Sequence, residues 1–294
     1  MNYQHQYHFG NFADILKHCV LIFCLEKLHE KSSNFLAIDT HSSSGKFNVN
    51  DERILKTNEF NEGLKKILSQ FDYQQILPHK YLEILAKINI CKINELGDKI
   101  KFYPGSPLLI KNFLRNTDKA IFAESQNLIF NELRRNFAGN KKILCLNENG
   151  FDLTKSKLPS AQARALILID PAYEKNQNKI SSDYESAINS LQEGFKRCGN
   201  GIFLLWHPII KAEEEFLQNF YQKILNLKFQ TIHHLTFDIG EFAENKNKMH
   251  QCGMFIFNMP WQVDKKINLY FPKILKVLEN SNNSNYNFIQ LKGE

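Results

Sequence analysis

Short apolar runs alternate with longer amphipathic segments over most of this chain of 294 residues. The runs are rich in aliphatic residues and bounded by polar ones, which is typical of strands buried in a parallel sheet. The longer segments carry apolar residues at helical spacing, and Asn11 is placed to cap the first of them. The expected strands are 35–39, 120–123, 143–146, 166–170 and 202–206. The expected helices are 12–31, 106–115, 127–136, 184–197 and 209–227.

The C-terminal part of the chain has a different pattern. Segments 230–238 and 253–258 are expected to form a closing, hairpin-like pair of strands, and 286–291 adds a short strand to a tail that otherwise frays. The polar segment 240–250 between the pair is expected to be mobile. Five strand–helix alternations followed by an antiparallel end predict an α/β fold with a doubly wound sheet.

The regular alternation is interrupted after the first strand. Two polar helices, 59–71 and 80–95, are expected there, separated by a loop that contains proline. We therefore divide the chain into 1–45, with the N-terminal helix and first strand, 46–101, an inserted helical subdomain, and 102–294, the remainder of the main domain.

Composition narrows the class of protein. The chain is 43% hydrophobic and 23% charged, as in ordinary globular proteins, and its net charge of +6 favours a polyanionic partner without requiring one. The six cysteines include no C-x-x-C pair, so we expect no metal site, and they suit a reducing compartment. There is no signal-peptide pattern in 1–10 and no long apolar stretch, so we expect a cytoplasmic protein that does not enter a membrane.

The tetrapeptide Asp170-Pro171-Ala172-Tyr173 directly follows the apolar run 165–169. Ligands of open α/β sheets bind beyond the carboxyl ends of such strands. A carboxylate and the proline carbonyl can accept the two hydrogens of an exocyclic amine, while the aromatic ring stacks on the base. The pattern therefore predicts the methylation of a planar amino-base on nitrogen.

Several other motifs occur in a distinctive order along nearly the whole chain. They are Tyr3 with 10–18, Asp39-Thr40-His41 with Gly45, Tyr103-Pro104-Gly105-Ser106-Pro107, Glu124, Gly150, Asp170-Pro171-Ala172-Tyr173-Glu174, Trp206-His207-Pro208, and Gly253-Met254 with Asn258, Pro260 and Trp261. In this order the chain resembles the RlmJ family, bacterial 23S ribosomal RNA adenine-N6 methyltransferases. The resemblance implies a Rossmann-like class I methyltransferase domain that depends on S-adenosylmethionine and carries a small inserted helical subdomain.

The resemblance also implies the reaction and the residues that carry it. The methyl group of S-adenosylmethionine would pass to N6 of adenine 2030 in 23S rRNA. Asp170 would orient the amine and accept its proton, the Pro171 carbonyl would be the second acceptor, and Tyr173 would stack on the flipped base. Tyr3 and Lys17 would contact the RNA, and a monomer is expected. The cofactor residues carry over to His18, His41, Ser106, Glu124, Asn149, Gly150 and Asp170.

Each of these roles has a plainer alternative. Asp170 can cap the following turn, Tyr173 can be a packing aromatic, and Glu124 can be a surface acid, although a carboxylate suits the two ribose hydroxyls of a nucleoside. Ser106 can cap a helix whose first residue is Pro107. Lysines expected to meet RNA phosphates, each with a solvated-surface alternative, are Lys46, Lys56, Lys65, Lys66, Lys80, Lys175, Lys179, Lys246 and Lys248.

The chain departs from the family pattern at three places. Ala172 replaces the second proline of the usual tetrapeptide, and three serines, 42–44, precede the single Gly45 where glycines are usual. Such a serine can crowd the cofactor or form a hydrogen bond with it. Asn149 replaces an aspartate, and a neutral amide accepts more weakly than a carboxylate. We therefore expect weaker cofactor affinity.

Three other functions remain open. A DNA adenine-N6 methyltransferase would share the tetrapeptide, but the chain has no separate target-recognition segment, which favours rRNA. An RNA-binding protein that has lost catalysis would explain the serine-rich loop. A nucleotide-dependent oxidoreductase is disfavoured, because no G-x-G-x-x-G follows the first strand.

Overall fold

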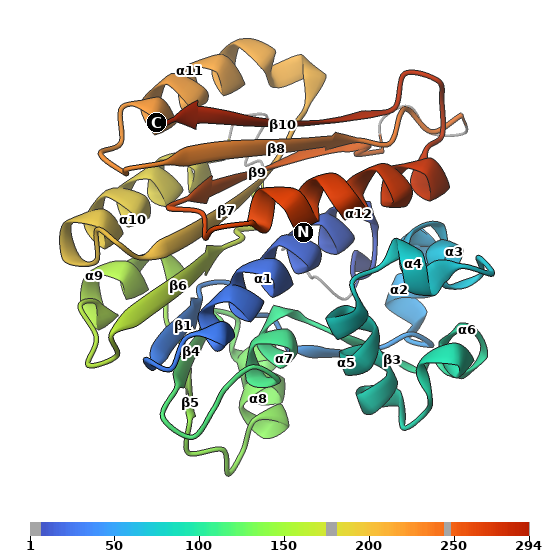
Figure 1. The fold of residues 1–294 in the computed structure, drawn as a ribbon, viewed down its shortest axis with the longest axis horizontal. Helices are drawn as coiled ribbons and strands as arrows, with labels where there is room; N and C mark the ends of the chain where they lie inside the picture. Colours follow the sequence, from blue (N-terminus) through green and yellow to red (C-terminus); the bar gives the residue numbers. More distant parts are fainter. Residues whose placement is uncertain (1–6, 175–180, 244–247, 294) are drawn as a thin grey trace.

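The computed structural model describes residues 7–174, 181–243 and 248–293. In these residues one large sheet has the strand order β10-β8-β9-β7-β6-β1-β4-β5 (Figure 1). Its strands are β1 (Phe35–Asp39), β4 (Lys119–Ala123), β5 (Ile143–Leu146), β6 (Arg164–Ile169), β7 (Ile202–Pro208), β8 (Ile232–Asp238), β9 (Gln251–Phe257) and β10 (Asn285–Lys292). The five neighbouring strands β7, β6, β1, β4 and β5 are parallel. Strand β9 lies between β7 and β8 and is antiparallel to both. The predicted doubly wound sheet with an antiparallel end is confirmed.

Helices cover both faces of this sheet (Figure 1). The inner strands are buried on both sides: Leu166 and Leu168 of β6 belong to one hydrophobic core, and Ile167 and Ile169 belong to the other. This two-sided burial explains why the strand is a continuous apolar run rather than an alternating one. One core contains residues of α1 (Phe12–Glu30), α7 (Ser106–Lys111), α8 (Asn127–Asn136) and α12 (Val263–Leu278). The other contains residues of α9 (Leu153–Lys157), α10 (Asp183–Arg197) and α11 (Glu214–Leu225).

The helix α12 was not predicted from the sequence. Its buried residues recur at helical spacing, from Val263 through Ile267 to Leu278, but Pro272 lies inside the helix. A proline in a helix interior removes one backbone hydrogen bond and is usually taken to end a helix. Here α12 packs along α1 and β10, and this tertiary contact outweighs the local cost.

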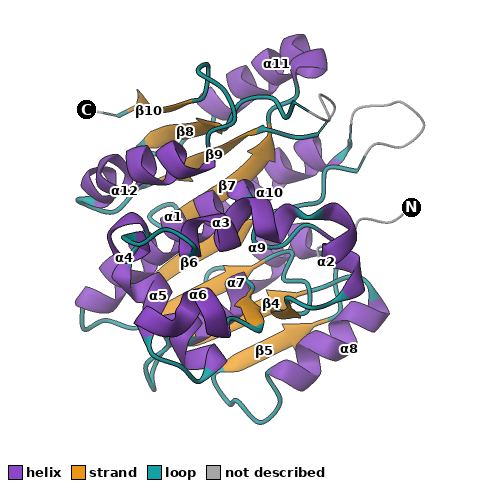
Figure 2. Cartoon of the chain, turned by 90° about the vertical axis from the view of Figure 1, so that its right-hand side faces the viewer, coloured by secondary structure: helices purple, strands orange, loops and turns teal. Residues whose placement is uncertain are grey.

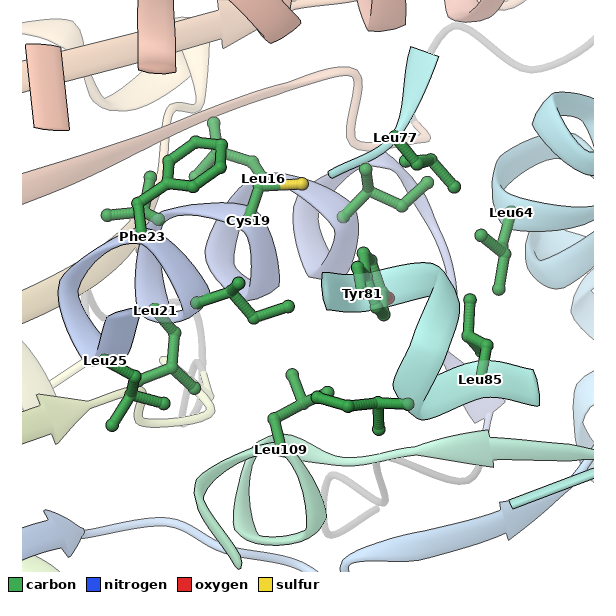
Figure 3. Packing of buried hydrophobic residues seen from close by; sticks show 14 of the residues in the cluster. Leu16, Cys19, Leu21, Phe23, Leu25, Leu64, Leu77, Tyr81, Leu85 and Leu109 are labelled. Atoms are coloured by element: carbon green, nitrogen blue, oxygen red, sulfur yellow. The ribbon is translucent and has the colours of Figure 1, made fainter. Parts of the chain in front are cut away.

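The first helix, α1, is buried on nearly all sides. The Oδ1 atom of its cap Asn11 accepts a hydrogen bond of 2.9 Å from the amide of Asp14, as the capping prediction required. Every residue from Phe12 to Leu25 is buried, and Figure 3 shows side chains from α1 packed against Tyr81 and Leu109. Because α1 is buried in this way, its polar residues need partners within the protein. In a separate respect, no helix in the described residues is long and apolar enough to cross a membrane.

The inserted region is more broken than predicted. Strand β2 (Lys46–Asn48) pairs antiparallel with β3 (Phe102–Pro104) at its base, and short helices fill the interval, grouped in front of the sheet in Figure 2. They are α2 (Glu52–Thr57), a π-helical turn (Asn61–Lys65), α3 (Lys66–Leu68), α4 (Tyr73–Ile76), α5 (His79–Asn89), a 3₁₀ turn (Ile93–Glu95) and α6 (Leu96–Lys99). The two long helices predicted at 59–71 and 80–95 are therefore wrong in extent.

Two local features break these helices. Ile90 adopts a left-handed conformation with φ of 53° and ends α5. Gly63 has non-helical φ and ψ angles, and a Cβ atom at this position would lie 2.1 Å from the carbonyl oxygen of Gly10. The amide of Leu64 donates to that same oxygen at 2.8 Å. The insertion is thus attached to the segment that precedes α1, and only glycine permits so close an approach.

Candidate active site

A cavity of about 510 Å³ opens at the carboxyl ends of the parallel strands. Residues that end or follow four different strands line it: His41 after β1, Glu124 after β4, Asp170 after β6 and Trp206 in β7. This is the sheet edge where the sequence placed a ligand site. The predicted site residues that line the cavity are Lys17, His18, His41, Ser106, Glu124, Asp170, Pro171 and Tyr173.

Lys17 joins two carboxylates at the inner end of this cavity. Its Nζ atom lies 2.8 Å from Oδ1 of Asp14 and forms an ion pair with Oδ2 of Asp170. The other Asp14 oxygen accepts a hydrogen bond of 2.9 Å from the amide of Gly10. Burial acts to lower the pKa of Lys17, but the two carboxylates together raise it above its ordinary value. Lys17 is therefore a permanent cation that fixes Asp170, and its predicted contact with RNA stays a prediction.

Two tyrosines that the sequence analysis did not single out for the site orient His18. The Nδ1 atom of His18 lies 2.9 Å from the hydroxyl of Tyr103 and 3.2 Å from that of Tyr81. The Tyr81 hydroxyl donates to that of Tyr103 at 3.1 Å. The two linked hydroxyls therefore hold the His18 ring at its Nδ1 atom. Tyr81 lies in the insertion, which thereby reaches the site.

The loop after β1 presents a neutral histidine. Nδ1 of His41 lies 2.7 Å from Oγ1 of Thr40, which itself donates to the carbonyl of Leu168, so Nδ1 is the donor. Burial lowers the pKa of His41 to about 3. Its Nε2 is then a hydrogen-bond acceptor at neutral pH. Burial also raises the pKa of the adjacent Asp39 to about 6, although a hydrogen bond from Ser106 opposes this.

The three serines of this loop have different environments. Ser42 Oγ donates to the carbonyl of Asp39 at 3.0 Å, and Ser44 Oγ donates to the carbonyl of Lys46 at 3.3 Å. Ser42 and Ser43 both line the cavity, and Ser43 adopts a left-handed backbone with φ of 48°. The Oγ atom of Ser43 is buried and has no hydrogen-bond partner among the described residues. The Ser43 hydroxyl is therefore the one of these two that is left to bind a ligand.

Ser106, the first residue of α7, and Glu124, the residue after β4, both line the cavity. Helix α7 begins at Ser106, and its cap is Gly105, so the prediction that Ser106 caps the helix with Pro107 first is wrong. The Gly105 amide donates to the carbonyl of Gly45 at 3.0 Å, so the residue before the helix is joined to the loop after β1. Glu124 accepts a hydrogen bond of 2.7 Å from the amide of Gln126 through Oε1.

Asn149 and Gly150 are not among the described residues that line the cavity. The Oδ1 atom of Asn149 accepts a 3.1 Å hydrogen bond from the amide of Phe151 and caps a 3₁₀ turn, Gly150–Asp152. A Cβ atom at Gly150 would lie 1.7 Å from the carbonyl oxygen of Thr40. Gly150 thus allows the loops after β1 and β5 to touch, and the role of both residues in cofactor binding stays a prediction.

Tyr173 is held rigidly beside Asp170. It has a left-handed backbone with φ of 51°, its hydroxyl donates to the carbonyl of Trp206 at 2.7 Å, and its ring lies 4.4 Å from that of Tyr184. Its amide donates to Asp183 at 3.0 Å. These contacts fix the direction of a ring that belongs to the second hydrophobic core, and its predicted stacking on a base stays a prediction.

Residues of the insertion and of the segment before β9 also line the cavity, among them Lys248, which the sequence placed near the site. Lys248, which follows β8, forms an ion pair with Glu62 of the insertion and lies 4.4 Å from the ring centre of Phe242. Glu59 of the insertion holds Asn11 at 2.8 Å. Of the lysines expected to meet phosphate, Lys65, Lys80 and Lys248 have partners within the protein. Tyr3, Lys175, Lys179 and Lys246 lie outside the described residues.

The family model described as "Ribosomal RNA large subunit methyltransferase D, RlmJ" matches residues 32–288. The chain belongs to the RlmJ family. Ribosomal RNA large subunit methyltransferase J of Escherichia coli is 32% identical to it over 278 residues, with 92% of each chain covered. The protein of the same name from Haemophilus influenzae is 29% identical, with 95% and 94% covered. The family resemblance drawn from the motifs is confirmed.

A solved structure shares the fold over nearly the whole length. The crystal structure of a Legionella pneumophila protein superposes with a TM-score of 0.80 at 22% identity, covering 98% of this chain and 99% of that one. The fold of this chain is thus present in an experimental structure over nearly its whole length.

Proposed function

We propose that this protein transfers a methyl group from S-adenosylmethionine to N6 of adenine 2030 in 23S ribosomal RNA. The observation that carries the proposal is the Asp170 carboxylate at the carboxyl end of β6, which lines the cavity next to Pro171 and Tyr173. Membership of the RlmJ family supports the class of reaction and an rRNA substrate. A cavity of about 510 Å³ is within the range of small-molecule sites.

The residues around the cavity fit the methyl donor. The Ser43 hydroxyl is buried without a partner among the described residues, as expected for a group that meets a polar ligand. Glu124, after β4, provides a carboxylate for the two ribose hydroxyls, and His41 provides a neutral acceptor. When bound, S-adenosylmethionine supplies an electrophilic methyl carbon.

The acidic tetrapeptide then acts on the adenine amine. Lys17 occupies Oδ2 of Asp170, which leaves Oδ1 to accept one amine hydrogen, while the Pro171 carbonyl accepts the other. The lone pair of a free adenine amine is delocalised into the ring, so holding both hydrogens directs that lone pair toward the incoming carbon. As the new bond forms, the nitrogen becomes acidic and Asp170 takes its proton. Tyr173 stacks on the base and keeps it in the cavity.

The proposal is tested by methyl transfer to defined nucleic acids. We expect radiolabel from S-adenosylmethionine to enter a 23S rRNA fragment that contains adenine 2030, and mass mapping to place it on N6 of that base. Label that enters only duplex DNA would support the DNA methyltransferase alternative. RNA binding without any transfer would support the alternative that catalysis has been lost.

A further inference from the structure

A second concavity lies far from the proposed active site, at the opposite end of β4 and β5. It has a volume of about 540 Å³ and is lined by the residues that begin these strands and by the segment around the end of α9. Lys119 starts β4, whereas Glu124, which lines the active-site cavity, follows the same strand. At about 3.3 Å per residue, roughly 15 Å of strand separates the two sites. We call this second concavity the lysine groove.

The charge of the lysine groove is of one sign. Four of its lining residues are Lys119, Lys141, Lys142 and Lys157, and no aspartate or glutamate lines it. In the described part of the chain none of these lysines is paired with a carboxylate. Lys119 and Lys142 donate only to main-chain carbonyls, at 3.2 and 2.9 Å. Four lysines in the lining of one hollow, with no carboxylate among the lining residues, favour a polyanion.

The rest of the lining suits RNA in particular. Ser156, Ser160 and Gln162 provide hydroxyl and amide groups of the kind that bind phosphate and ribose oxygens. Leu144 also lines the groove, and this residue is 49% exposed on the edge strand β5 (Figure 1). A hollow lined by lysines and apolar residues can receive the shallow minor groove of an RNA helix, which presents sugars and phosphates rather than one strong charge.

We infer that the lysine groove is a second RNA-binding surface, which holds the stem next to the methylated loop while the adenine enters the active site. The inference rests on the proposed function, because it assigns a further part of the same rRNA to this surface. The contacts are with phosphates and sugars, so they strengthen binding without reading sequence. Lysines near a sheet edge also discourage edge-to-edge aggregation. Lys119 lies on β4 and Lys157 on α9, not on the edge strand β5, so that role does not account for them.

The test compares two RNAs and two triple variants. The groove variant carries Lys119→Gln, Lys141→Gln and Lys157→Gln, and Lys142 is kept because its ammonium group supports the loop at Leu114. The control variant removes the same charge elsewhere, through Lys211→Gln, Lys228→Gln and Lys276→Gln, at three exposed lysines. The RNAs are a minimal stem-loop containing adenine 2030 and the same stem-loop extended by its natural flanking helix.

The groove variant is expected to bind the extended RNA about tenfold more weakly at low salt, with the slope of log Kd against log salt reduced by about two to three. Its binding and methylation of the minimal stem-loop are expected to match the control. Equal affinity of groove variant and control for the extended RNA would overturn the inference, and so would an equal loss on both RNAs. A groove variant that loses binding of a polyglutamate peptide but not of RNA would also overturn it, in favour of an acidic protein partner.

Binding is measured by fluorescence anisotropy and does not depend on catalysis. If the wild-type protein binds the extended RNA through the groove but methylates neither RNA, the proposed function is wrong, whereas the RNA-binding role of the lysine groove is supported. If the wild-type protein methylates both RNAs and the groove variant binds and methylates them equally well, the RNA-binding role of the groove is wrong, whereas the proposed function is supported.

Discussion

Lys17 on α1 holds Asp170 at the end of β6 by an ion pair between positions 153 residues apart in the sequence. The two side chains are only 6% and 14% exposed, so water screens the pair little. Asp14 binds the same ammonium group at 2.8 Å from the previous turn of the helix. The first helix therefore sets the direction of the carboxylate at the catalytic edge of the sheet.

The variant Asp14→Asn tests this arrangement without changing the shape of the side chain. An amide oxygen holds the Lys17 ammonium more weakly than a carboxylate, so Asp170 loses part of its orientation. We expect kcat to fall about tenfold, which corresponds to roughly 1.4 kcal/mol, with an unchanged KM for rRNA. Steady-state kinetics on a 23S fragment measure both. The matched control is Glu26→Gln on the same helix, which loses a pair with Lys266 instead. A higher KM with normal kcat would mean that Lys17 serves RNA binding, as the sequence suggested.

Ser43→Gly should move stability and cofactor affinity in opposite directions. Glycine adopts the left-handed backbone of residue 43 without strain, so the free energy of unfolding should rise by about 1 kcal/mol. The variant also loses the buried hydroxyl that faces the cavity, so affinity for S-adenosylmethionine should fall several-fold. Urea titration and calorimetric titration measure the two effects. Tighter binding by the glycine variant would show that the serine crowds the cofactor.

Glu124→Gln should weaken S-adenosylmethionine binding by about tenfold to a hundredfold, because two hydroxyls then lose a charged acceptor. The unfolding free energy should change little, since Glu124 is partly exposed. Calorimetric titration gives the affinity. Glu148→Gln, at an exposed position after β5, is the control and should bind normally. Equal affinities of wild type and Glu124→Gln for S-adenosylmethionine would show that Glu124 does not bind the cofactor.

A buried histidine pair makes stability depend on pH. The Nε2 atoms of His207 and His234 lie 3.0 Å apart, and Nδ1 of His207 donates to the carbonyl of Pro208, so His207 Nε2 accepts the proton of His234. Burial lowers the pKa of His207 to about 4, and burial together with His207 lowers the pKa of His234. Between about pH 6.5 and pH 4, His207 is protonated in the unfolded chain but stays neutral in the folded protein. Stability is therefore lost as pH falls through this window.

The measurement is the difference in unfolding free energy between wild type and His207→Gln at several pH values. The difference is needed because Asp39, whose pKa burial raises to about 6, takes up a proton in the folded state within the same window and opposes the loss. We expect the wild type to lose about 3 kcal/mol relative to the variant between pH 7 and pH 4. Parallel pH curves for the two proteins would contradict the assignment.

The positions of the strands along the chain and the sheet-edge site were predictable from local patterns, whereas the order of the strands in the sheet was not predicted. Each buried strand is a short apolar run, and the residues at the strand ends, Glu124 and Asp170, meet because parallel strands end at one edge. The partners of the buried polar groups were not predictable. Nothing in the sequence near Lys17 indicates Asp170, and nothing near His18 indicates Tyr81, because both contacts depend on how α1 lies between the sheet and the insertion.

The broken helices were missed for a related reason. Gly63 was compatible with a helix locally, but the approach of Gly10 requires a non-helical backbone there. Helix α12 was not predicted at all, and it continues through Pro272 where packing against α1 and β10 outweighs the lost hydrogen bond. In each case a contact distant in sequence decided the local conformation.

The most direct test of the account is a comparison of Asp170→Asn with wild type in single-turnover methyl transfer to the 23S fragment. The amide keeps the size of the side chain but cannot accept the proton of the adenine amine. We predict a loss of at least a hundredfold in the rate of transfer, with RNA and S-adenosylmethionine still bound within a few-fold of wild type. Transfer by the variant at the wild-type rate would contradict the central claim that this carboxylate presents and deprotonates the base.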